Sequence, residues 1–443
     1  MKRLFRFYPV LALLCMMLFI SSCDLLHGVS SNANNPSVTT TATPIPIVSP
    51  TPIPPVSTNC PETGTARAAI MPPLPPGKHQ GVLYISNQTS GNNYIGTLSR
   101  YDVVSGQKTD LLTITATGAA PSLPSLSQAI AEARISDNGQ WVVLVTEVDG
   151  KEAIQLVRAD GQEVQTLYCT ASGNDLFNTL SFSPDTKYLT FEEYPVYTTG
   201  SQNLVLLELA SGKLHVAEQL LDTQASAIYE PIKWRGNTSL YANYSLIGVG
   251  DTRNRHKVYL LPDVTQNSTS QQISLPNIPG GTGDTCYDFD FSPDNTQLLT
   301  SDCLGSGRGY SGPSTIETVP LAGGAPHVIH TSQHTIPYAR FITNTTIWFA
   351  INDYPDTGSN GLWKINIDGS GLTRLTTQGA SFELLSYSSN MHISPDNTMF
   401  AIEGGGASSV APISIGSFNG GNTSRINPTN QSSVLNLVGW TTF

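Results

Sequence analysis

The sequence has few charged residues and lacks the short motifs of several common enzyme sites. Asp, Glu, Lys and Arg make up only 12% of the 443 residues, while Ser, Thr, Asn and Gly are abundant. This balance is common in exported all-β proteins and argues against long amphipathic helices. The chain has no H-E-x-x-H, no G-x-x-x-x-G-K-[ST] and no dinucleotide fingerprint in a βαβ unit. Around Ser311, RGYSGPS has the wrong glycine spacing for a nucleophile elbow.

Basic residues are also scarce. The chain has 22 Lys and Arg against 33 Asp and Glu, which gives a formal net charge of −11 at pH 7. An acidic surface repels phosphate backbones, because nucleic-acid binding depends on a basic surface that releases counterions. We therefore expect no nucleic-acid partner.

The N-terminus is predicted to be an export signal. Basic residues precede an apolar run from Tyr8 to Ile20 that is short for a membrane span. The following ISSC resembles the lipobox of bacterial lipoproteins, which implies that residues 1–22 are removed and that Cys23 is diacylated on its thiol. A simple secretory signal cut nearby is the alternative. Both signals predict a protein outside the cytoplasm, and the lipobox predicts membrane anchoring in the cell envelope.

A tether is predicted to follow over residues 23–76, ahead of a folded domain over residues 77–443. The tether is rich in Ser, Thr, Asn and Pro and includes TATPIPIVSPTPIPP from Thr41 to Pro55. Such a segment cannot bury enough apolar surface to offset its ordering entropy. Its prolines favour extended, semi-rigid conformations, so it would hold the domain away from a membrane.

Four cysteines remain once Cys15 leaves with the signal and Cys23 is lipidated. Thiols outside the cytoplasm favour disulfides, and four of them allow three connectivities. Cys286 and Cys303 flank one hairpin and would lie opposite each other, so we favour that pair. By elimination, Cys60 would then join Cys169 and attach the end of the tether to the domain.

One hairpin motif recurs along the chain. SFSPDTKYLTFEE starts at Ser181, and similar segments are DFSPDNTQLLTSD and HISPDNTMFAIEG. Proline suits the second position of a type I turn, while Ser and Asp bond nearby amides. Counting weaker copies, the equivalent positions are Ser136, Ser183, Arg235, Ser292, Ile342 and Ser394. Their spacing of roughly fifty residues predicts one four-stranded unit per repeat.

A second turn recurs once more than the first. It is centred on Gly106, Gly161, Gly212, Asp263, Gly323, Gly369 and Gly420. The extra copy lies near the N-terminus, where three strands lack a preceding one, while SVLNLVGWTTF at the C-terminus supplies one strand without a successor. We therefore predict an all-β propeller of seven four-stranded blades, closed by strands from both termini, with six or eight blades as alternatives.

The repeats resemble a known family. FSPDTKYLTF, FSPDNTQLLT and ISPDNTMFAI, followed by segments such as LVLLELASGK, are similar to the WD40-like repeats of TolB-type propellers. The likeness covers roughly residues 78–443 and implies a propeller fold. The protein after which the family is named has an additional N-terminal α/β domain and six blades. This chain instead shows a predicted tether, a lipobox and seven predicted blades.

Polar residues recur where the second strand of each unit is expected to end. They are Glu147, Glu193, Tyr244, Asp302, Asp353 and Glu403. In a propeller these strand ends and the long loops after them lie on one face, so the acids could ring a mouth of the central channel. Such a face would suit a glycan, a cationic peptide or calcium. The alternative is that these are solvated loop residues with no common target.

The densest histidine group, His327, His330 and His334, is weak evidence for a metal site. A strand places His327 and His330 on opposite faces, and the run holds no carboxylate or thiol. We therefore expect ordinary histidines there, and no cofactor beyond a possible calcium ion.

The sequence thus favours a lipid-anchored scaffold that binds an envelope protein, a peptide or a glycan through its long-loop face. The first alternative is a metal-assisted hydrolase or lyase acting on sugars or lactones. The second is a purely structural docking surface for envelope proteins.

Overall fold

Within its described residues, the computed structural model contains twenty-eight strands and no helix that is long and apolar enough to cross a membrane. It describes residues 57–69, 72–77, 79–117, 128–171, 175–195, 202–220, 226–247, 257–273, 286–303, 313–351, 353, 358–376, 391–403, 412–421, 423–429 and 433–443. Cys23 and most of the predicted tether lie outside these residues.

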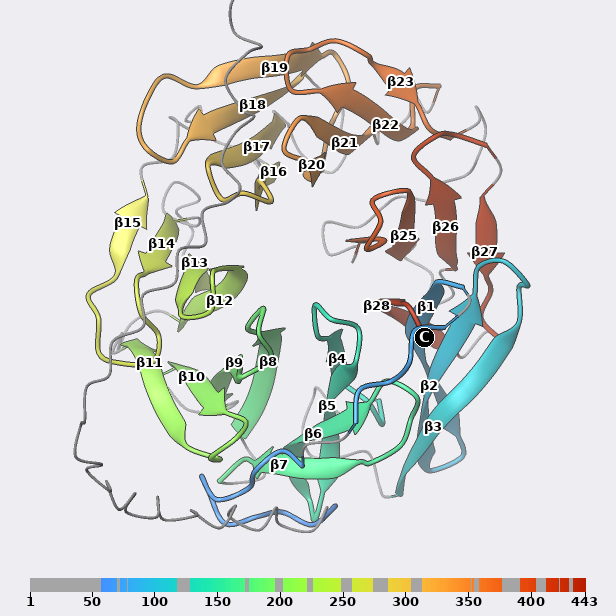
Figure 1. The fold of residues 1–443 in the computed structure, drawn as a ribbon, viewed down its shortest axis with the longest axis vertical. Coiled ribbons are helices and arrows are strands. Elements are labelled where there is room, and N and C mark those ends of the chain that lie inside the picture. Colours follow the sequence, from blue (N-terminus) through green and yellow to red (C-terminus); the bar gives the residue numbers. More distant parts are fainter. Residues whose placement is uncertain are drawn as a thin grey trace, which may run out of the picture. The chain divides into compact units, whose positions relative to one another are not determined.

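The strands form seven antiparallel four-stranded sheets arranged around a centre, which confirms the predicted propeller (Figure 1). Blade 1 contains β28 (Val434–Thr441), β1 (Gly81–Ser90), β2 (Asn93–Asp102) and β3 (Lys108–Thr117). Blade 2 contains β4 (Glu132–Ile135), β5 (Trp141–Val148), β6 (Lys151–Arg158) and β7 (Gln165–Cys169). Blade 3 contains β8 (Asp175–Phe182), β9 (Tyr188–Pro195), β10 (Gln202–Glu208) and β11 (Leu214–Leu220).

The remaining blades follow the same order from the innermost strand outwards. Blade 4 contains β12 (Ser226–Arg235), β13 (Ser239–Ile247), β14 (Lys257–Leu261) and β15 (Gln271–Ile273). Blade 5 contains β16 (Cys286–Phe291), β17 (Gln297–Cys303), β18 (Ser314–Pro320) and β19 (His327–Ser332). Blade 6 contains β20 (Ala339–Thr343), β21 (Thr346–Ile351), β22 (Gly361–Asn366) and β23 (Thr373–Arg374). Blade 7 contains β24 (Met391–Ile393), β25 (Met399–Glu403), β26 (Ile413–Ser417) and β27 (Ser424–Ile426).

Blade 1 combines both ends of the chain, as the unequal turn counts predicted. The C-terminal β28 is its innermost strand and pairs antiparallel with β1 from Gly81↔Thr441 to Asn87↔Val434. Apolar clusters join blade 1 to blade 7 and to blade 2, and so continue the core around the ring. The register shifts within this pairing, and Gly439 lies beside the shift.

The recurring hairpin turn is held by its own Ser and Asp. In blade 3, Ser183 Oγ donates to Asp185 Oδ1 at 2.8 Å and accepts from the amide of Tyr188 at 3.0 Å. The same side-chain bond occurs between Ser292 and Asp294 and between Ser394 and Asp396, and in blade 2 an Asn takes the place of Asp. These contacts account for the repetition of the motif, because each copy satisfies the backbone of the same tight turn.

The turns between first and second strands and between third and fourth strands leave one face of the ring, which we call the turn face. The opposite face, the loop face, carries the connections from second to third strands and from each blade to the next. Its second-to-third connections are long in blades 3 to 7: residues 196–201, 248–256, 304–313, 352–360 and 404–412. In blades 1 and 2, the corresponding connections are only two residues long, residues 91–92 and 149–150.

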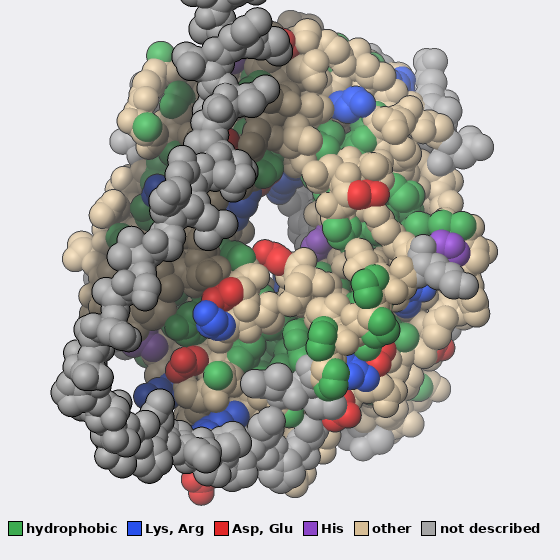
Figure 2. Space-filling model, in the orientation of Figure 1, with side chains coloured by type: hydrophobic (Ala, Val, Ile, Leu, Met, Phe, Trp, Pro, Cys, Tyr) green, Lys and Arg blue, Asp and Glu red, His purple; other side chains and the backbone are tan. Residues whose placement is uncertain are grey.

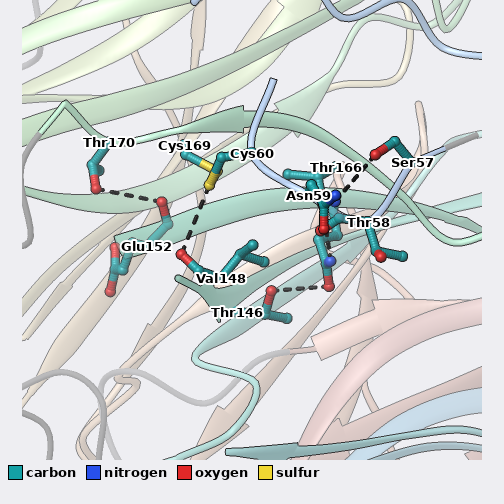
Figure 3. The surroundings of a disulfide bond; sticks show 11 residues. Ser57, Thr58, Asn59, Cys60, Thr146, Val148, Glu152, Thr166, Cys169 and Thr170 are labelled. Atoms are coloured by element: carbon teal, nitrogen blue, oxygen red, sulfur yellow. Dashed lines mark hydrogen bonds between the residues drawn. A yellow bond between two sulfur atoms is a disulfide. The ribbon is translucent and has the colours of Figure 1, made fainter. Parts of the chain in front are cut away.

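Residues 57–69 and 72–77, which we call the strap, pack against the propeller before its first strand. Cys60 is bonded to Cys169 across a sequence separation of 109 residues, as predicted (Figure 3). The backbone register places Cys286 directly opposite Cys303, but their side chains lie outside the described part, so that disulfide stays a prediction.

Substitution of Gly439 is expected to weaken the ring closure. Its φ of 146° is a conformation that other residues rarely adopt, and a Cβ there would lie 2.6 Å from Ile135 Cγ2. We expect Gly439→Ala to lower the free energy of unfolding by about 2–4 kcal/mol, measured by urea denaturation. Gly91→Ala is the matched control, because Gly91 also has a positive φ but open space around it. Equal losses for the two variants would contradict this assignment.

Candidate functional site

The backbone places the six predicted face residues at equivalent points, near or just after the end of each second strand in blades 2 to 7. The side chains of Tyr244 and Asp302 lie outside the described part. Of the other four, Glu147 makes no hydrogen bond or ion pair with a described residue. The remaining three, Glu193, Asp353 and Glu403, accept hydrogen bonds from nearby protein groups.

Glu193 pairs with a tyrosine of the preceding blade. Tyr168 Oη lies 3.1 and 3.2 Å from the two carboxylate oxygens. Burial raises the pKa of Glu193, and the hydrogen bond from Tyr168 opposes that rise. Burial and then the charge of Glu193 raise the pKa of Tyr168. The pair therefore links blades 2 and 3 at the loop face.

Asp353 is only 4% exposed and holds the chain where it passes from blade 5 to blade 6. Its carboxylate accepts from the amide of Thr335 at 2.7 Å and lies 2.5 Å from His334 Nδ1. The amide of Asp353 donates to Asn360 Oδ1 at 2.7 Å. With Nδ1 of His334 directed at the carboxylate, Nε2 is the ring nitrogen left for other contacts.

Glu403 contacts the strand that closes the ring. Its Oε2 accepts from the amide of Leu437 at 3.0 Å, and its Oε1 lies 3.5 Å from Asn436 Nδ2. Leu437 belongs to β28, whereas Glu403 ends β25 of blade 7. This acid therefore fastens the C-terminal strand to the neighbouring blade.

Three further acids, which the sequence pattern did not single out, make the same kind of link. Glu152 accepts from the amide of Phe177 at 2.6 Å, Glu132 from that of Leu180 at 3.2 Å, and Asp290 from that of Phe341 at 2.8 Å. Each bond runs from one blade to the innermost strand of the next. Nothing in the local sequence separates these acids from solvated ones, because the acceptor and donor belong to different repeats.

A second ring of polar side chains lies on the innermost strands. Two residues before each inner turn, blades 2 to 7 carry partly exposed polar side chains: Arg134, Ser181, Lys233, Asp290, Arg340 and His392. The residue after each of them packs into an apolar cluster between blades. Figure 2 shows an opening at the centre of the ring with basic, acidic and histidine side chains at its border.

Charges of both signs meet in this inner ring. Lys233 Nζ donates to the carbonyls of Phe291 and Ser292 at 2.8 and 3.2 Å, and burial lowers its pKa against the opposing effect of Asp290. Arg134 forms an ion pair of 3.0 Å with Glu132. The ring therefore offers a mixed polar lining rather than a field of one sign.

His392 is the most perturbed member of the inner ring. Burial, assisted by the positive charge of Arg134, lowers its pKa to about 4. The imidazole is therefore neutral at pH 7. Trp440 of blade 1 donates its Nε1 proton to the carbonyl of His392 at 3.0 Å, so this residue also marks the junction between blades 7 and 1.

The described side chains provide no group of three His, Cys, Asp or Glu placed to hold a metal ion. The side chains of the three clustered histidines have different surroundings. His327 is exposed, His330 packs on Phe349 with ring centroids 5.5 Å apart, and His334 contacts Asp353. Burial lowers the pKa of His330. Close spacing in the sequence therefore does not bring their nitrogens to one point.

A groove of about 720 Å³ lies between blades 4 and 5 on the turn face. Arg235, Tyr241, Gln271 and Asn295 supply polar groups to its lining. Tyr241 stacks on Phe291 with centroids 4.0 Å apart. Sequence reasoning missed this groove, since its two walls come from separate repeats.

Known proteins match this chain in fold but not in sequence family. No family model matches the sequence, and no curated protein does. Among solved structures, an oligogalacturonate lyase in complex with manganese has a TM-score of 0.50 and 11% identity, over 75% of this chain and 90% of that one. TolB from Acinetobacter baumannii has a TM-score of 0.44 and 15% identity, over 81% of this chain and 82% of that one. A prolyl endopeptidase has a TM-score of 0.49 and 13% identity, over 68% of this chain but 43% of its own.

Removal of the Glu403 carboxylate is expected to destabilise the fold. Glu403→Ala leaves the amide of Leu437 without its acceptor, which should lower the free energy of unfolding by about 1–3 kcal/mol. Glu147→Ala is the matched control and should change it by less than about 0.5 kcal/mol. Urea denaturation of both variants tests this, and a neutral Glu403→Ala would show that the bond does not support the closing strand.

The pH dependence of stability should contain a contribution from His392. The pKa is about 4 in the folded chain and near the ordinary 6.5 when unfolded, so the unfolded chain binds more protons between these values. Stability should therefore be full above pH 6.5 and fall towards pH 4, by up to about 3 kcal/mol. His392→Gln should flatten this slope in denaturation curves, whereas the exposed His327→Gln should not. Identical slopes in all three proteins would refute the assignment.

Proposed function

We propose that this protein is a lipid-anchored, extracytoplasmic propeller that binds an envelope protein, or a peptide segment of one, through its loop face. The proposal rests on the difference in connection length between the two faces. On the turn face, the connections within a blade span two to six residues, except residues 262–270 in blade 4, and the strap crosses part of this face. On the loop face, the second-to-third connections of blades 4 to 7 span nine or ten residues each and that of blade 3 spans six, and long loops on a rigid scaffold are the usual place for recognition.

The compartment is supported by the disulfide. Cys60–Cys169 closes a long loop between the strap and blade 2, and such bonds persist in oxidising surroundings. This agrees with the export signal in the sequence. Lipid attachment at Cys23 rests on the lipobox resemblance alone.

The contacts of the predicted acids favour binding over catalysis. Glu193, Asp353 and Glu403 already accept hydrogen bonds from protein groups, so these carboxylates act first as supports for the loop face. A hydrolase or lyase acting on sugars or lactones is the alternative function. The inner ring, with Lys233, Arg340 and His392 at the central opening, is where its chemistry would be sought.

Shortening the loops should abolish partner capture. We expect crosslinking in the native envelope, followed by mass spectrometry, to identify a partner that is lost when residues 304–312 and 354–357 are each replaced by a two-residue Asn-Gly turn. The matched control replaces the exposed Asn419–Gly421 turn of blade 7 on the turn face with a longer one, which should leave capture intact. Capture of the same partners by all three proteins would exclude the loop face as the binding site.

The anchor is tested in the same cells. Cys23→Ala should abolish incorporation of a labelled fatty acid and move the protein from the membrane fraction to the soluble one. Persistent labelling would place the lipid elsewhere. If the wild-type protein incorporated no labelled fatty acid, the N-terminal segment would be a cleaved secretory signal without lipid attachment.

A further inference from the structure

The first described residues of the strap lie along the outer edge of blade 2 (Figure 3). The amide of Thr166 in β7 donates to the carbonyl of Ser57 at 2.7 Å, and Thr166 Oγ1 donates to the carbonyl of Thr58 at 2.8 Å. Cys60 then joins Cys169 at the end of the same strand. Within four residues, the strap is therefore fixed to β7 by a covalent bond and two hydrogen bonds.

Blade 2 supports this attachment from within. Thr146 Oγ1 of β5 donates to Gln155 Oε1 of β6 at 2.9 Å, and Gln155 Nε2 donates to Thr166 Oγ1 at 3.1 Å. This chain of buried hydrogen bonds continues to the carbonyl of Thr58 and so connects the strap with the second strand. All five residues of β7 are buried, although it is the outermost strand of its blade. The point of attachment is therefore part of the blade core.

Beyond Cys60 the described strap is held only by non-covalent contacts. The amide of Ala68 donates to the carbonyl of Leu209 at 2.7 Å, and the amide of Gly77 donates to the carbonyl of Thr442 at 2.6 Å. The chain then enters β1 at Gly81, whose partner on β28 is Thr441. Tension transmitted along the strap would thus act on Gly81↔Thr441, the first residue pair between β1 and β28.

We propose that the Cys60–Cys169 disulfide has a mechanical function: it transfers tension from the N-terminal anchor to blade 2 and keeps that tension off the closing strand. The proposal rests on the anchoring proposed above. With the bond intact, Cys60 stays at Cys169, so force applied before Cys60 cannot extend the residues after it. Without the bond, the same force would detach the strap and then peel β1 from β28, starting at the pair Gly81↔Thr441.

Single-molecule force spectroscopy tests this on the chain from residue 24 to residue 443, which needs no lipid. One handle is attached enzymatically at the N-terminus and the other at the exposed Gly323 turn of blade 5, where a side chain would meet nothing. In the oxidised protein, the strap should not extend before the propeller itself unfolds. The Cys60→Ser/Cys169→Ser variant should lengthen at lower force as residues 61–80 extend, with a contour of about 70 Å at ~3.5 Å per residue.

A shifted handle provides the matched control. Inserted at Gly64, in the turn closed by the bond from the amide of Thr65 to the carbonyl of Glu62, the handle lies beyond the disulfide. Oxidised protein pulled from there should open as early as the Cys60→Ser/Cys169→Ser variant. Should that double variant fail to fold, reduction of the held wild type by dithiothreitol takes its place.

Two results would overturn the proposal. One is early lengthening of the oxidised protein pulled from residue 24. The other is the absence of early lengthening when the oxidised protein is pulled from Gly64. An unlabelled Cys23 in the envelope would instead remove the anchor while leaving the transfer of force, as measured on the isolated chain, intact.

Discussion

The pairing of β28 with β1 is the contact on which the rest of the ring depends. Each blade buries its two faces only against its neighbours, so an open row of seven blades would expose an apolar face at both ends. The cluster that joins blade 1 to blade 7 includes Leu435, Leu437 and Trp440 of β28, so it forms only when the two termini share one sheet. The positive φ of Gly439 and the hydrogen bond from the amide of Leu437 to the carboxylate of Glu403 adapt the chain to this closure.

Carboxylates perform a common task around this ring. A sheet arranged radially leaves the inner edge of its first strand without a pairing partner, and buried amides there need acceptors. Glu152, Asp290 and Glu403 supply acceptors across blade boundaries. Charged residues make up only 12% of the chain, and several of its acids accept internal hydrogen bonds rather than facing solvent.

The architecture was predictable from sequence, whereas the roles of the acids were not. Turn chemistry is local: Ser183 and Asp185 bond residues of their own turn, so a short motif reveals them, and counting two turn types reveals the closure. The Cys60–Cys169 pair followed from elimination. The position of Asp353 at a strand end was also foreseeable, but its contact with Thr335 was not, because that contact depends on how one blade approaches the next. The route of the strap across the turn face has no sequence signature at all.

The chain order of these contacts also sets a sequence of events during folding. Cys60 and Cys169 are both present once β1 to β7 have been made, which is seven of the twenty-eight described strands, whereas β28 is the last strand to appear. An arc containing the strap and blade 2 can therefore be covalently secured while β1 still lacks its partner. Until β28 is made, the unfinished propeller would carry an unpaired β1 edge that could pair with another chain, and the pairing of the C-terminal strand would remove this exposed edge.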